Sequence, residues 1–450
     1  MILLRAKISL FANILILLFA TPVAAQSALP PAMTLRDAVQ AALQRNPTLA
    51  AASSSVDAAS ATSDAARGLR YPRLDLSTGA QRTDSPMGAF GSLLQQRRIT
   101  TADFAPRRLN HPGYVTNYQS QAALSLPLYH GGVISAAQTQ AHHQLQASEA
   151  LRLAQQQQIT AQVIASFIAI KEAQSQQRAN TLATNAASQR LHDVEQLQQQ
   201  GMALQSDIMD AQAHLLQSQL ATIHSANALA HARDTLDQLT ATPKVKILGK
   251  VELAAIKGSR TQWQTKALAQ RQGLRALQYQ RSALDETRAM ARATFLPDID
   301  LMAVQQWNSN TPGLKNRNTA LGATISINLF AGGSDQAKLR VSEAKISVLD
   351  SDIAALRQSI KTEIADRWRG LKEAKMAQNI AAQIAQQRTE ALRIRTLRHQ
   401  QGLEKSSDLL RAQVANDQAQ VAAIHARYGL LQAQSDLYLA AGALIPKVIQ

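Results

Sequence analysis

Two hydrophobic patterns alternate along this chain, and the longer one has the period of a coiled coil. Ile346, Leu349, Ile353, Leu356 and Ile360 follow one another at steps of three and four residues. This spacing places them along one seam of a helix that packs against another helix. Residues 134–199 and 334–400 contain no proline. Because a helix rises about 1.5 Å per residue, each segment predicts a helix of roughly 100 Å.

The second pattern alternates every two residues, as in a β-strand with two different faces. In the first half Tyr118, Ala122, Leu124, Leu126 and Leu128 alternate with Gln119, Gln121 and Ser125. In the second half Leu321, Ala323, Ile325, Ile327 and Leu329 alternate with Gly322, Thr324, Ser326 and Asn328. Such segments fit tilted membrane strands of about 9–11 residues with one face toward lipid and one toward an aqueous lumen. Any single one fits a half-buried strand of a soluble sheet equally well.

Each half predicts a hairpin whose two strands both lead to helices. Pro72 and Pro297 open the partner strands, a position where proline is tolerated. The helices are charged and polar, so we expect them in water on one side, with the hairpin loops on the other. The first loop, roughly 82–117, holds Arg97-Arg98 and Arg107-Arg108. We expect it either to touch exterior ligands or to form a solvated cover over a pore mouth.

The chain repeats itself once. Gly131-Gly132 recurs as Gly332-Gly333, 201 residues later. Upstream the offset is 225 residues, as between Pro72 and Pro297, so the first half carries 24 extra residues before Gly131. A period this long indicates a duplicated domain rather than a solenoid. Each half predicts the order helix, strand, strand, long helix, helix.

The ends and the composition divide the chain further. Arg5 and Lys7 precede an apolar run that ends at Val23-Ala24-Ala25, which is the pattern of a secretory signal peptide. We therefore expect a signal peptide at 1–25, a first repeat at 26–240, a connecting segment at 241–262 and a second repeat at 263–450. The chain has no cysteine, so no disulfide framework is expected. The net charge is +16, but the basic residues are spread along helices, so we expect no nucleic-acid partner.

Four strands cannot close a barrel, and an open sheet edge in lipid leaves backbone groups unpaired. We therefore expect copies of the chain to associate with cyclic symmetry. Strand counting allows two copies with eight strands or three copies with twelve. Only three copies leave an aqueous lumen of useful width.

The mature chain resembles the TolC-like outer-membrane efflux factors over essentially its whole length. The resemblance rests on the order, duplication and spacing of four motifs: Ala42-Leu43-x-x-Asn46-Pro47-x-Leu49 in the first helix, Pro297-x-Ile299-Asp300-Leu301, Leu329-Phe330-Ala331-Gly332-Gly333 and the paired Gln-Gly-x₄-Ser-Asp segments. It implies a mainly α fold with a membrane β-barrel. A homotrimer would form a twelve-stranded barrel in outer-membrane lipid and a long α-helical tunnel through the periplasm.

The resemblance also implies a function and partners. The chain would be the outer-membrane channel component of a tripartite efflux or type I secretion system, and it would conduct substrate passively to the exterior. Its partners would be a periplasmic adaptor (membrane fusion) protein and an inner-membrane transporter. The alternative is a periplasmic coiled-coil adaptor or scaffold protein without a pore.

The same resemblance places the periplasmic entrance at two turns between long helices. Gly201-Met202 and Gly402-Leu403 would be the helix tips that meet the adaptor, and glycine permits the backbone angles of such turns. Ser206 and Ser407, or the Asp residues that follow them, are candidate N-caps. Asp207 and Asp408 either stabilise a helix start or line a constriction, with Asp408 from three chains around the lumen.

Three further residues complete the expected gate, and two of them depart from the family pattern. Arg411 stands where relatives have a second acidic residue, so a purely anionic ring is not expected. Glu404 stands where some relatives have a basic residue that holds the entrance closed, so that contact does not carry over. His399 falls at the position of an aromatic gate residue in some relatives.

The sequence offers no signal for catalysis. It has no phosphate-binding glycine loop, no His-Glu-x-x-His and no cysteine cluster, which are the motifs that would carry such chemistry. His142-His143 are adjacent on a predicted helix, so they point about 100° apart and chelate a metal poorly. We therefore expect no enzyme, no cofactor and no metal site.

Overall fold

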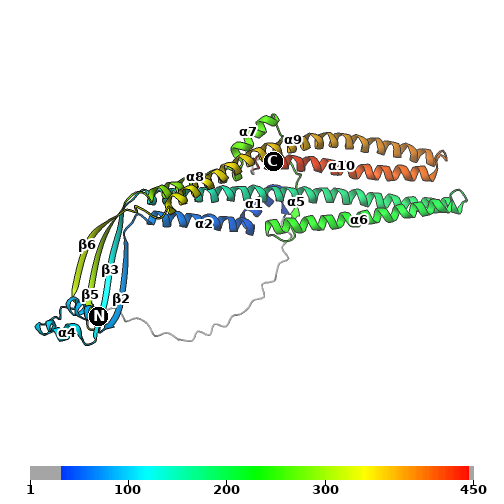
Figure 1. The fold of residues 1–450 in the computed structure, drawn as a ribbon. Coiled ribbons are helices and arrows are strands. Elements are labelled where there is room, and N and C mark those ends of the chain that lie inside the picture. The colour runs from blue at the N-terminus through cyan, green and yellow to red at the C-terminus, as the bar shows by residue number, and fades with distance from the viewer. Residues whose placement is uncertain (1–31, 445–450) are drawn as a thin grey trace, which may run out of the picture.

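The structure, a computed structural model, describes residues 32–444, and its two halves contain matching elements (Figure 1). The first half consists of α1 (Leu35–Arg45), α2 (Pro47–Gly68), β2 (Arg73–Thr83), β3 (Val115–His130), α5 (Val133–Gln199) and α6 (Gln205–Thr240). The second half consists of α7 (Arg260–Gln270), α8 (Gln272–Ala293), β5 (Asp298–Ser309), β6 (Arg317–Ser326), α9 (Ser334–Gln400) and α10 (Ser406–Ala440). The fold class is confirmed as a duplicated, mainly helical unit with strands. The predicted signal peptide lies outside the described residues.

The prediction of a single opening helix in each half is wrong, because both helices are broken. Asn46 has extended backbone angles and lies between α1 and α2. A residue before proline avoids the helical conformation, and Pro47 then starts the new helix. The Asn46 side chain accepts a hydrogen bond from the Thr48 N–H at 3.0 Å and donates one to the Leu239 carbonyl at 3.1 Å. In the second half Arg271 makes the same break without a proline.

The four longer strands form one antiparallel sheet in the order β2-β3-β5-β6. The expected strand starts are confirmed, since β2 and β5 begin directly after Pro72 and Pro297. The strand expected at 321–329 is displaced, because β6 begins at Arg317 and ends at Ser326. Ser326 pairs with Asp298, the first residue of β5, so residues beyond Ser326 have no partner on that strand.

The register gives the sheet one apolar and one polar face. Leu74 is opposite Leu124, Leu124 is opposite Ala303, and Ala303 is opposite Leu321. Opposed residues point to the same face, so the apolar positions gather on one side, and Leu74, Leu124 and Leu321 are exposed there. On the other face Gln121 lies opposite Gln306, and the Gln306 amide donates to Gln121 at 3.0 Å.

The long loop of the first half is folded rather than irregular. It contains α3 (Pro86–Gln95), a 3₁₀ helix (Thr101–Phe104) and α4 (Pro106–Asn110) at the end of the sheet far from the long helices (Figure 1). The buried Gln96 side chain donates to the Thr116 carbonyl at 2.8 Å and to the Asn117 side chain at 2.9 Å. Asn117 lies on the polar face of the sheet, so the loop packs against that face.

The long helices lie side by side, with α10 in contact with both α9 and α5, and α5 in contact with α6 (Figure 1). Nearer the sheet, α5 contacts α2 and α8, and α8 contacts α9. A two-residue parallel pair, β1 (Ala32–Met33) with β4 (Lys246–Ile247), joins the start of the described chain to the segment after α6. No helix in the described range 32–444 has the length and apolar character that a membrane span requires.

The hydrophobic core lies where the helices of both halves meet. Its fully buried side chains include Ile164 and Phe167 of α5, Ile360 and Ile364 of α9, and Leu437 of α10. Each side chain of this size stabilises the fold by about 1.5–3 kcal/mol. The predicted heptad seam is confirmed, since Ile346, Ile353 and Ile360 are all buried.

Candidate functional site

The two turns that connect the long helices have the same geometry. Gly201 has φ +74° and Gly402 has φ +75°, a region that glycine adopts without steric cost. In the first turn the N–H groups of Gly201 and Met202 donate to the carbonyls of Gln198 and Leu197, both at 2.8 Å. These bonds satisfy carbonyls that the end of a helix leaves free.

The second turn repeats this pattern. The N–H groups of Gly402 and Leu403 donate to the carbonyls of His399 and Arg398, both at 2.9 Å. The side chain of Leu403 is exposed, as is that of Met202 at the first turn. Each tip therefore presents an exposed apolar side chain directly after its glycine, and the first tip also exposes Leu204.

Glu404 fastens the second turn to α9. Its carboxylate lies 2.7 Å from the Arg395 guanidinium and 3.2 Å from that of Arg398, and only 11% of the side chain is exposed. The Glu404 carbonyl also accepts a hydrogen bond from Nδ1 of His399 at 2.8 Å. The predicted gate residues His399 and Glu404 are thus brought into contact, and both hold the tip of their own chain together. The partners Arg395 and Arg398 were not found from the sequence.

The serine caps expected at the two helix starts are wrong. Leu204 and Lys405 occupy the N-cap positions, and Asp207 and Asp408 lie three residues further on. The Asp207 carboxylate accepts the Leu204 N–H at 3.0 Å. Asp408 instead pairs with Arg411 at 3.3 Å, so two predicted gate residues of opposite charge lie together.

Arg190 of α5 is a residue of this region that sequence reasoning missed. It lines a small space between the two helical hairpins, together with Asp207 and Asp210 of α6 and Ser406, Ser407 and Leu410 of α10. Its Nε has no hydrogen-bond partner, and its nearest carboxylate, that of Asp193, is 3.8 Å away. Burial lowers the pKa of the Arg190 guanidinium, and Asp193 offsets part of that effect.

A sequence signal for Arg190 does exist. Ala187 and Val194 are buried seam residues of α5, and Arg190 falls between them at steps of three and four. A charged residue at such a position of a coiled-coil seam costs stability, and it can fix the register of the helices. Asp207 and Ser407 line the same space, so the structure brings together the starts of α6 and α10.

A larger hollow lies further along the helices. It has a volume of about 640 Å³ and is bounded by α5, α6 and α10. Nε2 of the buried His214 on α6 lies 3.7 Å from Asp417 on α10, and His425 of α10 contacts Glu172 of α5 at 2.8 Å. Both pairs connect one helical hairpin to the other.

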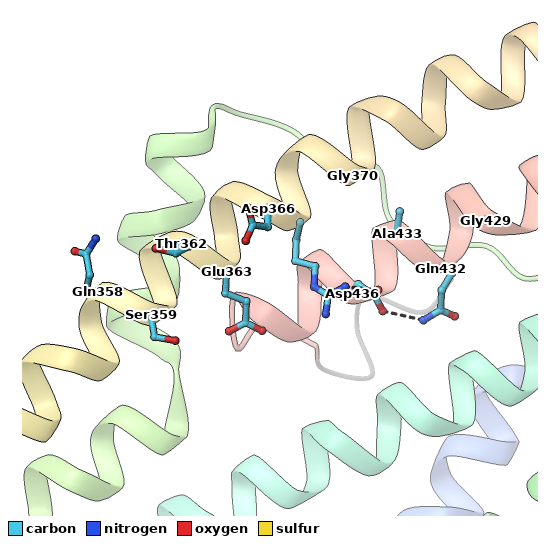
Figure 2. Close-up of a pocket in the computed structure, with 11 residues that line it drawn as sticks. Gln358, Ser359, Thr362, Glu363, Asp366, Gly370, Gly429, Gln432, Ala433 and Asp436 are labelled. Atoms are coloured by element: carbon cyan, nitrogen blue, oxygen red, sulfur yellow. Dashed lines mark hydrogen bonds and ion pairs between the residues drawn. The ribbon is translucent and has the colours of Figure 1, made fainter.

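A third hollow of about 730 Å³ lies between α9 and α10 (Figure 2). Gly370 and Gly429 line it from the two helices, and neither has a side chain to fill it. Each carboxylate that lines it already has a cation in the chain: Glu363 has Arg271, Asp366 has Arg369, and Asp436 has Arg367. These charges are satisfied without a ligand. Within residues 32–444 no three potential ligand side chains are grouped to hold a metal ion.

Comparison with known proteins decides the family. The sequence profile of the family described as "Outer membrane efflux protein" matches residues 38–242 and 263–443, which is most of the chain. The chain belongs to the outer membrane efflux protein family. It is accordingly an outer-membrane protein, and the TolC-like resemblance is confirmed.

Solved structures show the same fold at low sequence identity. A membrane protein from Pseudomonas aeruginosa superposes with a TM-score of 0.80 at 20% identity, covering 92% of this chain and 91% of that one. The outer membrane protein VceC from Vibrio cholerae gives 0.76 at 19% identity, covering 91% and 96%. The MtrE outer membrane channel of Neisseria gonorrhoeae, in its open state, gives 0.71 at 20% identity, covering 91% and 89%.

One curated relative matches over part of the chain. Protein CyaE of Bordetella pertussis is 26% identical over 176 residues, which are 36% of this chain and 37% of CyaE. The match therefore spans well under half of either protein.

Proposed function

We propose that three copies of this chain form the outer-membrane channel of a tripartite efflux or type I secretion system, which conducts substrate passively out of the cell. The observation that carries this proposal is that one copy has two incomplete edges. The sheet ends on one side at β2 and on the other at β6. Because unpaired backbone groups are costly in lipid, β6 of one copy would pair with β2 of the next until three copies close a barrel.

The edge helices support the same ring. On α6 the exposed apolar residues are Met209, Leu216, Leu220 and Ile223, which follow one another at heptad steps. On α9 they include Met376, Ile380, Ile394 and Leu397. Helices α6 and α9 lie at opposite sides of the helical layer (Figure 1). A head-to-tail contact would cover both stripes, and such contacts generate a closed ring when the rotation closes.

The partners follow from the position of the tips. Met202 and Leu403 are exposed apolar residues at the ends of two long helical hairpins, where a periplasmic adaptor would contact Gly201, Met202, Gly402 and Leu403. Energy would come from an inner-membrane transporter behind that adaptor. The chain itself would perform no catalysis and need no cofactor.

Mass and conductance test the proposal together. Protein released from outer membranes by detergent, and not by high salt, should have the mass of three chains and form water-filled pores in planar bilayers. The alternative, a periplasmic adaptor or scaffold, would leave the membrane in the salt wash and would not conduct. A stable monomer without conductance would exclude the channel.

We further propose that the tips form the periplasmic gate. Asp207, His399, Glu404, Asp408 and Arg411 would surround the narrow end of the lumen, and opening would move the two hairpins of each copy apart. Asp408 is the test residue, because its carboxylate faces Arg411 on its own helix. In a trimer the pair would present three carboxylates and three guanidinium groups.

Replacing Asp408 by alanine should leave those three guanidinium groups without counter-charges. Selectivity should then shift from cations toward anions, and the reversal potential in a potassium chloride gradient measures this shift. Asp57→Ala, at an exposed position of α2 far from the tips, is the charge-matched control. Equal reversal potentials for both variants would remove Asp408 from the constriction.

A further inference from the structure

At the outer end of the sheet, each of the two edge strands carries an exposed arginine on the apolar face. Arg82 is on the same face of β2 as Leu74 and Leu76, because an even number of positions separates it from each of them. It pairs with Thr116 of β3. Arg317 opens β6 on the face of Leu321 and lies opposite Trp307. Both guanidinium groups are exposed. The two edge strands therefore end in arginine on the side that the leucines share.

Toward the outer end of that face the side chains change from apolar to charged, as they do where a protein surface passes from the lipid core to the headgroups. From the helix end outward, β2 presents Leu74, Leu76, Thr78, Ala80 and then Arg82. Trp307 and Tyr118 lie on the same face near the outer end, and aromatic side chains of this kind prefer the level of the headgroups. Arginine directly beyond an aromatic level lies at the depth of lipid phosphates.

A third arginine, Arg97 of the loop, contacts the backbone of Arg317. The Arg97 guanidinium donates to the Arg317 carbonyl at 3.0 Å, which holds it at the outer end of β6. The Arg82 guanidinium lies 4.9 Å from the centre of the Tyr114 ring, which restrains it at the end of β2. Within residues 32–444, none of these three arginines forms an ion pair with a carboxylate.

Nearby acidic groups do not balance the charge of these arginines. The segments 82–117 and 310–319 contain seven Arg and Lys residues but only two acidic residues, Asp84 and Asp103. The Asp103 carboxylate is already engaged by Thr100 at 2.7 Å and by Arg108 at 3.2 Å. The outer end of the sheet therefore keeps an unbalanced positive charge.

We propose that Arg82, Arg97 and Arg317 bind the phosphate groups of lipids in the outer leaflet of the outer membrane. This inference rests on the proposed trimer and its orientation, with the helices in the periplasm. When β6 of one copy pairs with β2 of the next, Arg97 and Arg317 come to the same outer end of the barrel as Arg82 of the neighbouring copy. Each subunit boundary then holds three guanidinium groups, and guanidinium matches phosphate with two parallel charge-assisted hydrogen bonds.

The occupant is a lipid rather than a free anion because the site continues an apolar surface. A phosphorylated, acylated sugar places its phosphates at the level of the arginines and its acyl chains along Leu74, Leu76 and Leu321. Inorganic phosphate offers only the first of these contacts. The lipid would cover the seam between two copies, so its binding would also favour the assembled ring.

The test titrates the detergent-purified full chain with lipid A and with the same lipid stripped of its phosphates. Native mass spectrometry gives the dissociation constant for each lipid. We expect clearly tighter binding of the phosphorylated form. In the triple variant Arg82→Gln, Arg97→Gln, Arg317→Gln this binding should weaken roughly 100-fold, since each basic residue near an anionic lipid surface contributes about fivefold.

The control variant Arg70→Gln, Arg292→Gln, Arg340→Gln removes three exposed charges at the helix end of the sheet and should bind as the wild type does. Equal affinity for both lipids, or an unaffected triple variant, would overturn the proposal. Competition by inorganic phosphate as strong as that by lipid A would show a free-phosphate site instead. The trimer mass and conductance of the wild type report separately on the proposed function.

Discussion

At the scale of single residues, the α9–α10 tip depends on one carboxylate. Glu404 has two arginine partners on α9 and is nearly buried between them, while its carbonyl accepts from His399. These contacts close a loop of ten residues, from Arg395 to Glu404, by charge as well as by backbone hydrogen bonds. The α5–α6 tip has a weaker fastening, the bond from the Leu204 N–H to the Asp207 carboxylate.

Glu404→Gln should loosen this tip without unfolding the protein. The amide keeps the shape of the side chain but gives up both ion pairs, at a cost of about 1 kcal/mol because the arginines are half exposed. Hydrogen exchange should therefore accelerate at the backbone amides of residues 401–405, while the core helices keep their protection. Unchanged exchange at these amides would show that the glycine turn alone holds the tip.

A matched control is available on α9. Glu390 pairs with Arg393, three residues away, and both side chains are more than half exposed. A surface pair of this kind contributes little, so Glu390→Gln should leave the exchange at the tip as in the wild type.

Residue roles at the tips could be predicted only in part. Glycine at 201 and 402 follows from the need to reverse the chain, and the structure gives both a positive φ. The pairing of Glu404 with Arg395 could not be predicted, because it depends on how far the turn folds back along α9. Arg190 could have been noticed as a charge at a seam position, but its neighbours Ser406 and Ser407 belong to a helix more than 200 residues away.

At the scale of the elements, two glycines weaken the middle of long helices. Gly370 lies within α9 and Gly429 within α10, both with ordinary helical backbone angles. A Cβ at either position would meet no atom within 4 Å. Glycine at such positions lowers the stability of a helix, because glycine loses more conformational freedom on folding than other residues do. Because neither glycine has a side chain, the two positions leave space for the hollow between α9 and α10 (Figure 2).

Gly429→Ala should stabilise α10 by about 0.5–1 kcal/mol. The midpoint of thermal unfolding, followed by circular dichroism of the helices, should rise. Gly442→Ala provides a control of opposite sign. Gly442 has φ +64°, and its Cβ would lie 2.9 Å from the Gln270 carbonyl oxygen, so that midpoint should fall. A lower midpoint for Gly429→Ala would mean that the hollow must stay open for the helices to pack.

The helices and strands were largely predictable from the spacing of the hydrophobic residues and from the positions of proline and glycine. The steps between Ile346 and Ile360 gave a buried seam, and Pro72 and Pro297 marked two strand starts. The break at Arg271 carries no such mark. Its guanidinium binds Glu363 at 2.7 Å and the Ala440 carbonyl at 2.8 Å, so contacts with α9 and α10 fix a bend that local sequence does not require.

At the scale of the whole molecule, one copy is unfinished at both sides. The β2 and β6 edges and the apolar stripes of α6 and α9 lie on surfaces that the chain does not cover. Stripes of this kind mark an interaction site. The proposed ring of three copies pairs each edge with its opposite.

Charged residues introduced into the apolar stripe of α6 should therefore prevent assembly of the trimer. Leu216→Lys with Leu220→Lys places two charges in the proposed helix contact, where burial without a partner is costly. Detergent-purified protein should then run as single chains, whereas Leu182→Lys, at an exposed position of α5, should remain trimeric. Light scattering measures both masses. A trimer in the double variant would place the contact elsewhere.

The sequence by itself determined the repeat, the long helices, the hairpins and the family, because these depend on local period, on glycine and proline, and on motif order. Tertiary structure decided the rest: the break at Arg271, the pairing of Glu404, the place of Arg190 and the contact of Arg97 with Arg317 at the outer end of the sheet. Those features join residues far apart in the chain, and a contact of that kind leaves no periodic trace in either segment. Its energy depends on distance and burial, which exist only once the helices and strands have packed.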